Sequence, residues 1–207
     1  MVFCALLCTT NLFAAPDERV LELEKEFFYN GDFVKVYNSA IEMEEYAELM
    51  VNAENSLIIQ LFKNFAKIHL SDISDAMVAE FDKLEAKSVR MFGKDSRYTA
   101  FTYMLKSKYY SLVNEYDKSI ENGNKAVAIL NETSPKTLER AYALSNVGYI
   151  YVFKSDGASA EKYISSSLTL LKSLKQSKSW IAIHAHAYLA STYTVMGKLI
   201  EAAEEIA

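Results

Sequence analysis

Tyrosines recur at an almost constant interval in the second half of the 207-residue chain. Tyr110, Tyr151 and Tyr193 are separated by 41 and 42 residues. A small residue stands three positions before each tyrosine and another nine positions after it: Ser107, Gly148, Ala190, Ser119, Ala160 and Ala202. Close approach of two helices requires small side chains at the contact and a large ring in the neighbouring gap. The pattern therefore predicts one packed helix pair, repeated along the chain.

The sequence also predicts the links between the helices of these copies. Residues 103–130 predict two helices joined at residues 113–115, with Asn114 as the side-chain cap of the second helix. Ser134 and Pro135, with proline at the first helical position, predict another helix start. Asp156 followed by Gly157 predicts a further boundary.

The earlier chain follows the same plan less closely. In residues 17–44, Phe27 stands where the later copies have tyrosine, and residues 30–33 predict the turn. A second copy is expected over residues 54–88, with its turn at residues 70–74. Only six glycines and two prolines are present, which argues against a β protein with its many turns. We therefore expect an all-α fold over residues 16–207, an α-solenoid of about five antiparallel helix-turn-helix repeats.

These residues resemble a known repeat family. Gly148, Tyr151 and Ala160 in one copy, and Ala190, Tyr193, Gly197 and Ala202 in the next, are similar to the small residue, tyrosine, glycine turn and alanine of tetratricopeptide (TPR) repeats. The interval matches the long variant of about 42 residues found in kinesin-light-chain-like repeats. Residues 91–100, MFGKDSRYTA, look like the glycine-containing link that lengthens these repeats. Such repeats stack so that one concave face is formed.

The resemblance implies a binding groove. In the family, the first helix of each pair lines the concave side, which would expose a set of five residues to a protein or peptide ligand: Lys108, Tyr142, Asn146, Tyr149 and His184. Asn146 stands where family members often place an asparagine that hydrogen-bonds the backbone of a bound peptide. The resemblance thus predicts a non-enzymatic scaffold.

The amino terminus predicts export. The first fifteen residues carry no charge, whereas the next eleven carry seven charged side chains. The apolar part is shorter than the roughly 20 residues that span a bilayer, and its small residues suggest a signal peptide, residues 1–15, cleaved near Ala14 or Ala15. Two alternatives stay open, because no Lys or Arg precedes the apolar part: a buried first helix, or lipidation at Cys8. No membrane-spanning segment is expected in this stretch.

Catalytic and metal-binding patterns are not found in the sequence. His184 and His186 are about 200° apart around a helix, so they cannot grip one ion together, and His69 belongs to another copy. No glycine-rich phosphate loop or nucleophile elbow occurs. We expect no enzyme activity, no metal and no cofactor. The net charge of −5, without a basic stripe, argues against nucleic acid as a partner.

Together these expectations describe a protein- or peptide-binding scaffold of a bacterial cell envelope, periplasmic or secreted. The chain stops at Ala207 inside the second helix of the fifth copy, which suggests truncation at the C-terminus. One alternative is therefore the amino-terminal periplasmic sensor or docking region of a longer signalling protein, similar to some diguanylate cyclases, or of a TonB-type energy transducer. Another is a cytoplasmic peptide receptor, if residues 1–15 are retained.

Overall fold

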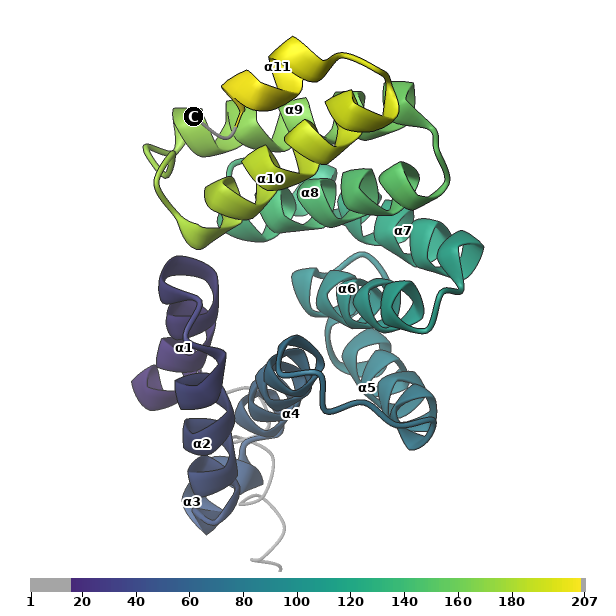
Figure 1. Ribbon diagram of the computed structural model, residues 1–207. Helices are drawn as coiled ribbons and strands as arrows, with labels where there is room; N and C mark the ends of the chain where they lie inside the picture. The colour runs from purple at the N-terminus through teal and green to yellow at the C-terminus, as the bar shows by residue number, and fades with distance from the viewer. Residues whose placement is uncertain (1–15, 206–207) are drawn as a thin grey trace, which may run out of the picture. The chain divides into compact units, whose positions relative to one another are not determined.

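The computed structural model describes residues 16–205, and the predicted signal peptide lies outside them (Figure 1). The described chain contains eleven α-helices and one π-helical turn and no strand, which confirms the all-α prediction. Contacts divide it into a first unit that ends at Asp72 and a second that begins at Ile73 and includes Phe28–Asn30. None of the described helices is both long and apolar enough to cross a bilayer.

The first unit contains four α-helices around an aromatic core. The predicted turn at residues 30–33 is present: Gly31 is left-handed, with φ of 68°, and the Asp32 carboxylate accepts the Lys35 N–H at the start of a helix. The helices are α1 (Glu18–Lys25), α2 (Phe33–Glu44), α3 (Ala47–Val51) and α4 (Ala53–His69). The π-helical turn (Glu26–Asn30) follows α1, and its last three residues are assigned to the second unit.

Three buried phenylalanines form the centre of this unit. The ring of Phe27 lies 5.7 Å from that of Phe62 and 5.1 Å from that of Phe65, centroid to centroid. His69 stacks on Phe33 at 4.1 Å and meets the edge of Phe27 at 5.3 Å. His69 is therefore a packing residue of the first unit.

The second unit repeats a pair of antiparallel helices. Within it α6 packs on α7, α8 on α9 and α10 on α11, and successive pairs meet through α7 with α8 and α9 with α10 (Figure 1). The first helices of neighbouring pairs also touch, α6 with α8 and α8 with α10. The elements are α5 (Ala76–Phe92), α6 (Arg97–Leu112), α7 (Tyr116–Thr133), α8 (Leu138–Phe153), α9 (Gly157–Ser173), α10 (Trp180–Val195) and α11 (Leu199–Glu204).

The predicted small residues lie where the helices of each pair cross. In the α6–α7 pair the Ser119 hydroxyl donates to the Ser107 carbonyl at 2.5 Å. In the α8–α9 pair, a Cβ on Gly148 would lie 2.5 Å from Ile164 Cγ1 and 3.1 Å from the carbonyl oxygen of Ala160. In the α10–α11 pair Ala190 and Ala202 are both buried and line a common apolar hollow.

The repeated tyrosines lie beside these crossings and reach the second helix of their own or the preceding pair. Lys118 places its ammonium 5.5 Å from the Tyr110 ring centroid. Tyr151 stacks on Tyr163 of α9, with centroids 5.6 Å apart. The Tyr193 hydroxyl of α10 donates to a carboxylate of α9 at 3.3 Å. The rings therefore cover the edges of the crossings, half-buried rather than inside the core.

Two predicted link features are wrong in detail. Asn114 does not cap α7; it has a φ of 62° and ends α6, because the next N–H, that of Glu115, bonds back to the Tyr110 carbonyl at 2.9 Å. Asparagine tolerates this left-handed conformation better than most residues. Pro135 precedes α8 in the link, and Thr137 is the cap. The boundary at Asp156 is confirmed, since its carboxylate accepts the Ser159 N–H.

The predicted second copy does not form a packed pair. A turn separates its two helices, and Ser71 within it is left-handed. However, α4 belongs to the first unit and packs against α2, whereas α5 belongs to the second unit and packs against α6. The regular pairing is therefore seen in the second unit, at the copies where the small and large positions are clearest in the sequence.

Candidate ligand-binding surface

Six rings form a continuous series in the second unit, which we call the aromatic string. It runs through Tyr116, Phe153, Tyr149, Tyr188, His184 and Trp180. Successive ring centroids are 5.4, 4.8, 4.1, 5.9 and 5.6 Å apart. Tyr116 stacks on Phe153, and Tyr149 of α8 stacks on Tyr188 of α10. The other three contacts of the string are edge-on. Both arrangements are favourable aromatic geometries.

Helical spacing places these rings on one surface. Tyr149 and Phe153 are four residues apart on α8, and Trp180, His184 and Tyr188 are spaced by four on α10. Residues at this interval lie on the same helix face, and α8 packs against α10. Phe153 is 51% exposed and His184 is also exposed, while the other rings are half-buried. The string is therefore held by neighbouring rings and still offers apolar surface to solvent.

One cation lies at the edge of the string. Lys108 extends from α6 with its ammonium 5.8 Å from the centroid of the Tyr149 ring, a cation–π distance. It is half-buried, and within the described part of the chain no carboxylate forms an ion pair with it. By contrast Lys106, two residues earlier, pairs with Asp82 at 2.7 Å and with Glu85.

Burial shifts the pKa values of three side chains at this edge of the string. Burial lowers the pKa of the Lys108 ammonium, because desolvation disfavours the charged form. Burial also lowers the pKa of His184, and the positive charge of Lys108 lowers it further. Burial raises the pKa of the Tyr188 hydroxyl, with a smaller contribution from Tyr149. At neutral pH the His184 and Tyr188 rings beside Lys108 are therefore uncharged.

The five predicted groove residues do not share one environment. Lys108, Tyr149 and His184 meet at the aromatic string, as described above. Tyr142 and Asn146 belong to the same face of α8 but are only 2% and 8% exposed, so the prediction that they are exposed is wrong.

Tyr142 is covered by other rings, among them Phe28, whose edge meets it at a centroid distance of 6.1 Å, and Trp180 at the start of α10. The Trp180 ring packs on Tyr142 with centroids 5.7 Å apart. Burial strongly raises the pKa of the Tyr142 hydroxyl, and a hydrogen bond with Asn146 lowers it by less. Asn146 is therefore engaged by a buried neighbour and is not placed to bind the backbone of a peptide.

The sequence analysis missed four members of the string: Tyr116, Phe153, Trp180 and Tyr188. The spacing of four on α8 and on α10 was a usable signal for three of them. Tyr116 begins a different helix, α7, and reaches Phe153 only through the packing of α7 on α8.

Among residues 16–205, no group of three or more His, Cys, Asp or Glu side chains is arranged to hold a metal ion. His184 joins the string, and the Tyr188 hydroxyl lies 3.4 Å from its Nδ1. His186 instead bonds Glu205 of the region after α11, Nδ1 to carboxylate, at 2.6 Å.

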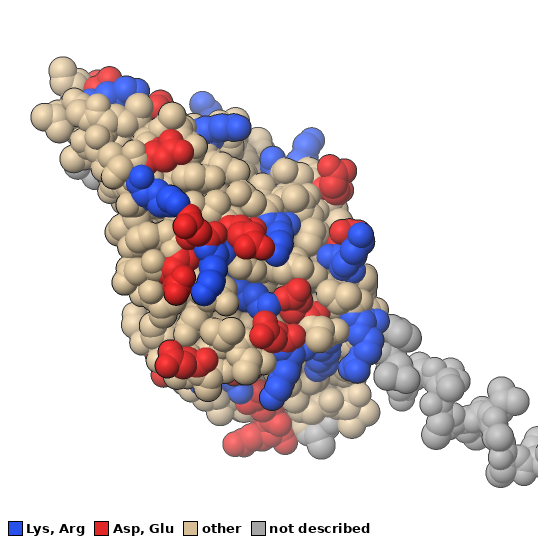
Figure 2. All heavy atoms as spheres, turned by 90° about the vertical axis from the view of Figure 1, so that its right-hand side faces the viewer, with Lys and Arg blue, Asp and Glu red and all other residues tan. Residues whose placement is uncertain are grey.

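The charged side chains of the surface are mixed in sign (Figure 2). On the face shown in Figure 2, acidic and basic side chains alternate, and no continuous basic stripe is visible. Neither the protein-family models nor the curated proteins contain a match to this chain. The geometry of the aromatic string is therefore the observation from which a function is proposed.

Replacing Lys108 tests whether this lysine lowers the free energy of unfolding of the protein. Lys108→Met is expected to be at least as stable as the wild type at pH 7, because it removes the free-energy cost of burying an amine that is charged in the unfolded chain. The pKa of Lys108 is lower in the folded than in the unfolded chain. Lys108 therefore lowers the free energy of unfolding by its full amount below the folded pKa, and this destabilisation disappears as the pH rises towards 10.5.

Chemical denaturation of both proteins from pH 7 to above 10.5 measures this difference, since other titrating groups cancel between them. Lys118→Met is the matched control, because that lysine is exposed and pairs with Glu115. A clear loss of stability in Lys108→Met at pH 7 would show that the lysine is structural.

Proposed function

We propose that this chain is a non-enzymatic scaffold of TPR-like helix pairs that binds an extended protein or peptide segment along the aromatic string. The observation that carries the proposal is the continuous series of six rings across α7, α8 and α10, with Lys108 at its edge. We further propose that it acts in a bacterial envelope after export by residues 1–15, which lie outside the described residues.

The repeat part of the proposal is supported by the regular pairs of the second unit. Helices α6 to α11 follow the interval of the repeated tyrosines, and small residues occupy each crossing. The string runs along α8 and α10, first helices of their pairs, with Lys108 on α6. These are the helices that line the concave side in tetratricopeptide repeats, which agrees with the resemblance seen in the sequence.

The physical basis of binding is the exposed ring surface. Aromatic anchors provide a large contact area with few rotatable bonds, and they dominate the energetics of many interfaces. Here each ring is already held by the next, so little side-chain entropy remains to be lost when a ligand binds. Micromolar affinity, about 8 kcal/mol, requires only a few such anchors and one or two polar contacts. Lys108 is placed to supply one of the polar contacts.

Site-specific crosslinking tests the proposal. With a photoreactive residue at Tyr149, a specific partner is expected to be captured in the native compartment. Additional Tyr188→Ala is expected to reduce capture about tenfold, because Tyr188 stacks on Tyr149 at 4.1 Å and loss of an anchor commonly costs more than about 1 kcal/mol.

The matched control places the same photoreactive residue at Tyr163. This tyrosine is also half-buried and in a ring pair, but it belongs to α9 and its hydroxyl bonds Asn124 of α7. Equal capture from both positions, or capture that is insensitive to Tyr188→Ala, would exclude the string as the binding surface.

A further inference from the structure

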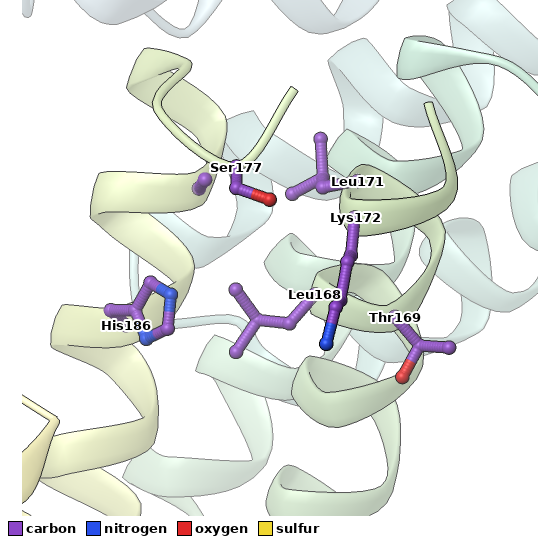
Figure 3. A pocket seen from close by; sticks show the side chains of 7 residues that line it. Leu168, Thr169, Leu171, Lys172, Ser177 and His186 are labelled. Carbon is purple, nitrogen blue, oxygen red and sulfur yellow. The ribbon is translucent and has the colours of Figure 1, made fainter. Parts of the chain in front are cut away.

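A small hollow lies between α9 and α10, formed by residues that the proposed function does not use. It has a volume of about 210 Å³ and is enclosed by the carboxyl-terminal half of α9, the following link and the first turns of α10 (Figure 3). Its lining residues are Leu168, Thr169, Leu171, Lys172, Ser177, Ala182 and His186.

Comparison with the preceding helix pair explains why space is left here. Thr137 and Ser179 are the amino-terminal caps of α8 and α10, and each accepts an N–H from the residue three positions later. Those residues are Arg140 and Ala182, so the two positions are equivalent. The preceding pair therefore has an arginine where the hollow has an alanine.

In the preceding pair the arginine side chain bonds the end of α7 and the link that follows it. Arg140 Nε donates to Asn131 Oδ1 at 2.6 Å, and its Nη1 donates to the carbonyl of Pro135 at 2.9 Å. Counted from the start of the second helix, the position of Asn131 in α7 corresponds to Lys172 in α9. The second site has thus lost the arginine side chain and gained a cation on the opposite wall.

Hydrogen-bonding groups line the hollow from α9, from the following link and from α10 (Figure 3). Lys172 makes no ion pair within the described residues and lines the hollow beside Thr169. His186 Nδ1 lies 2.6 Å from a Glu205 carboxylate oxygen, and a carboxylate can only accept, so Nδ1 carries the proton. The other ring nitrogen, Nε2, faces the hollow (Figure 3). The Ser177 hydroxyl comes from the link.

The remaining wall is apolar. Leu171 and Ala182 are buried and Leu168 is half-buried. A fitting ligand therefore combines a polar head for the ammonium and the hydroxyls with a short apolar chain. The single positive charge of Lys172 favours a ligand with one negative charge. A second negative charge on the ligand is disfavoured by the carboxylate of Glu205, which lies behind the imidazole.

We propose that this hollow binds a small organic monocarboxylate. Its carboxylate pairs with the Lys172 ammonium and accepts from the Thr169 and Ser177 hydroxyls, while its apolar chain lies on Leu168 and Leu171. The inference is independent of the aromatic string, since the string is formed by α7, α8 and the Trp180, His184 and Tyr188 face of α10.

Titration of the full chain with isovalerate tests this proposal. Calorimetry is expected to give a dissociation constant of about 1 mM, a plausible value for a ligand of this size, and NMR is expected to show shifts of the His186 ring signals. Isovaleramide has nearly the same shape without the charge and is expected to bind at least about tenfold more weakly. Inorganic phosphate is expected to bind more weakly than isovalerate.

Three variants localise the effect. Lys172→Asn restores the residue of the preceding pair and is expected to weaken isovalerate binding about tenfold. Ala182→Arg restores the arginine of the preceding pair and is expected to abolish binding, with circular dichroism used to confirm folding. Lys178→Asn removes an exposed lysine that does not line the hollow, and is expected to bind as the wild type.

Several results would overturn the proposal. No binding of isovalerate up to about 50 mM would do so, as would equal binding of isovaleramide or tighter binding of phosphate. An equal loss in Lys172→Asn and Lys178→Asn would show nonspecific attraction to the basic link. Loss of crosslinking at Tyr149 leaves these results unaffected, so the two proposals fail separately.

Discussion

Phe62→Ala is expected to lower the free energy of unfolding by about 3–5 kcal/mol, the usual cost of removing a buried ring. The side chain is completely buried in the first unit, with Phe27 and Phe65 each 5.7 Å away, centroid to centroid. Both the transfer of the ring and the cavity left between these two neighbours contribute. Urea denaturation measures the total effect, and amide exchange is expected to show loss of protection first in α1, α2 and α4.

The matched control is Phe153→Ala in the second unit. The same atoms are deleted, but this ring is 51% exposed and packs mainly against Tyr116 and Tyr149. We expect a cost below about 1 kcal/mol. Similar losses in the two variants would show that the first unit is not organised around its phenylalanine core.

Gly148→Ala is expected to destabilise the chain by about 1–3 kcal/mol, in the range of overpacked cores. Alanine is otherwise the better helix former by about 1 kcal/mol, so at an open helix position the same change would stabilise. Here the new methyl would lie 2.5 Å from Ile164 Cγ1 and 3.1 Å from two backbone atoms of α9. The two helices must separate, because a backbone contact cannot be relieved by a rotamer change.

A double-mutant cycle identifies the cause. Ile164→Ala removes the nearest atom, so the cost of Gly148→Ala is expected to be smaller in that background than in the wild type. The contact with the Ala160 carbonyl remains, and some loss is therefore expected even then. A stabilising effect of Gly148→Ala in the wild type would mean that α8 and α9 do not cross closely at this position.

Much of the second unit is predictable from local patterns. The interval of the tyrosines, with small residues before and after, identifies the pairs because close helix crossings restrict side-chain size. The cap at Asp156 is read correctly because an aspartate before a glycine and a helical run satisfies a nearby N–H. At Asn114 the same reasoning fails, since asparagine is equally suited to the left-handed end of the preceding helix.

The candidate binding surface is less predictable. Lys108, Tyr149 and His184 were identified by the resemblance to tetratricopeptide repeats, but Tyr142 was expected to be exposed with them. Its burial depends on Trp180, 38 residues later in the sequence, and no local pattern shows that these two rings meet. Likewise, the separation of α4 and α5 into two units depends on which partner each helix packs against.

By itself, the sequence determined that this protein is helical, where most helices begin and end, and which residues stand at the crossings, because caps, turns and side-chain size act over a few residues. Tertiary structure alone decided which rings are exposed, and that a hollow lies beside Ala182 while Arg140, at the equivalent position of the preceding pair, bonds Asn131. Burial is a property of distant neighbours: the same face of α8 is covered at Tyr142 and open at Phe153 because Trp180 packs at one end of it.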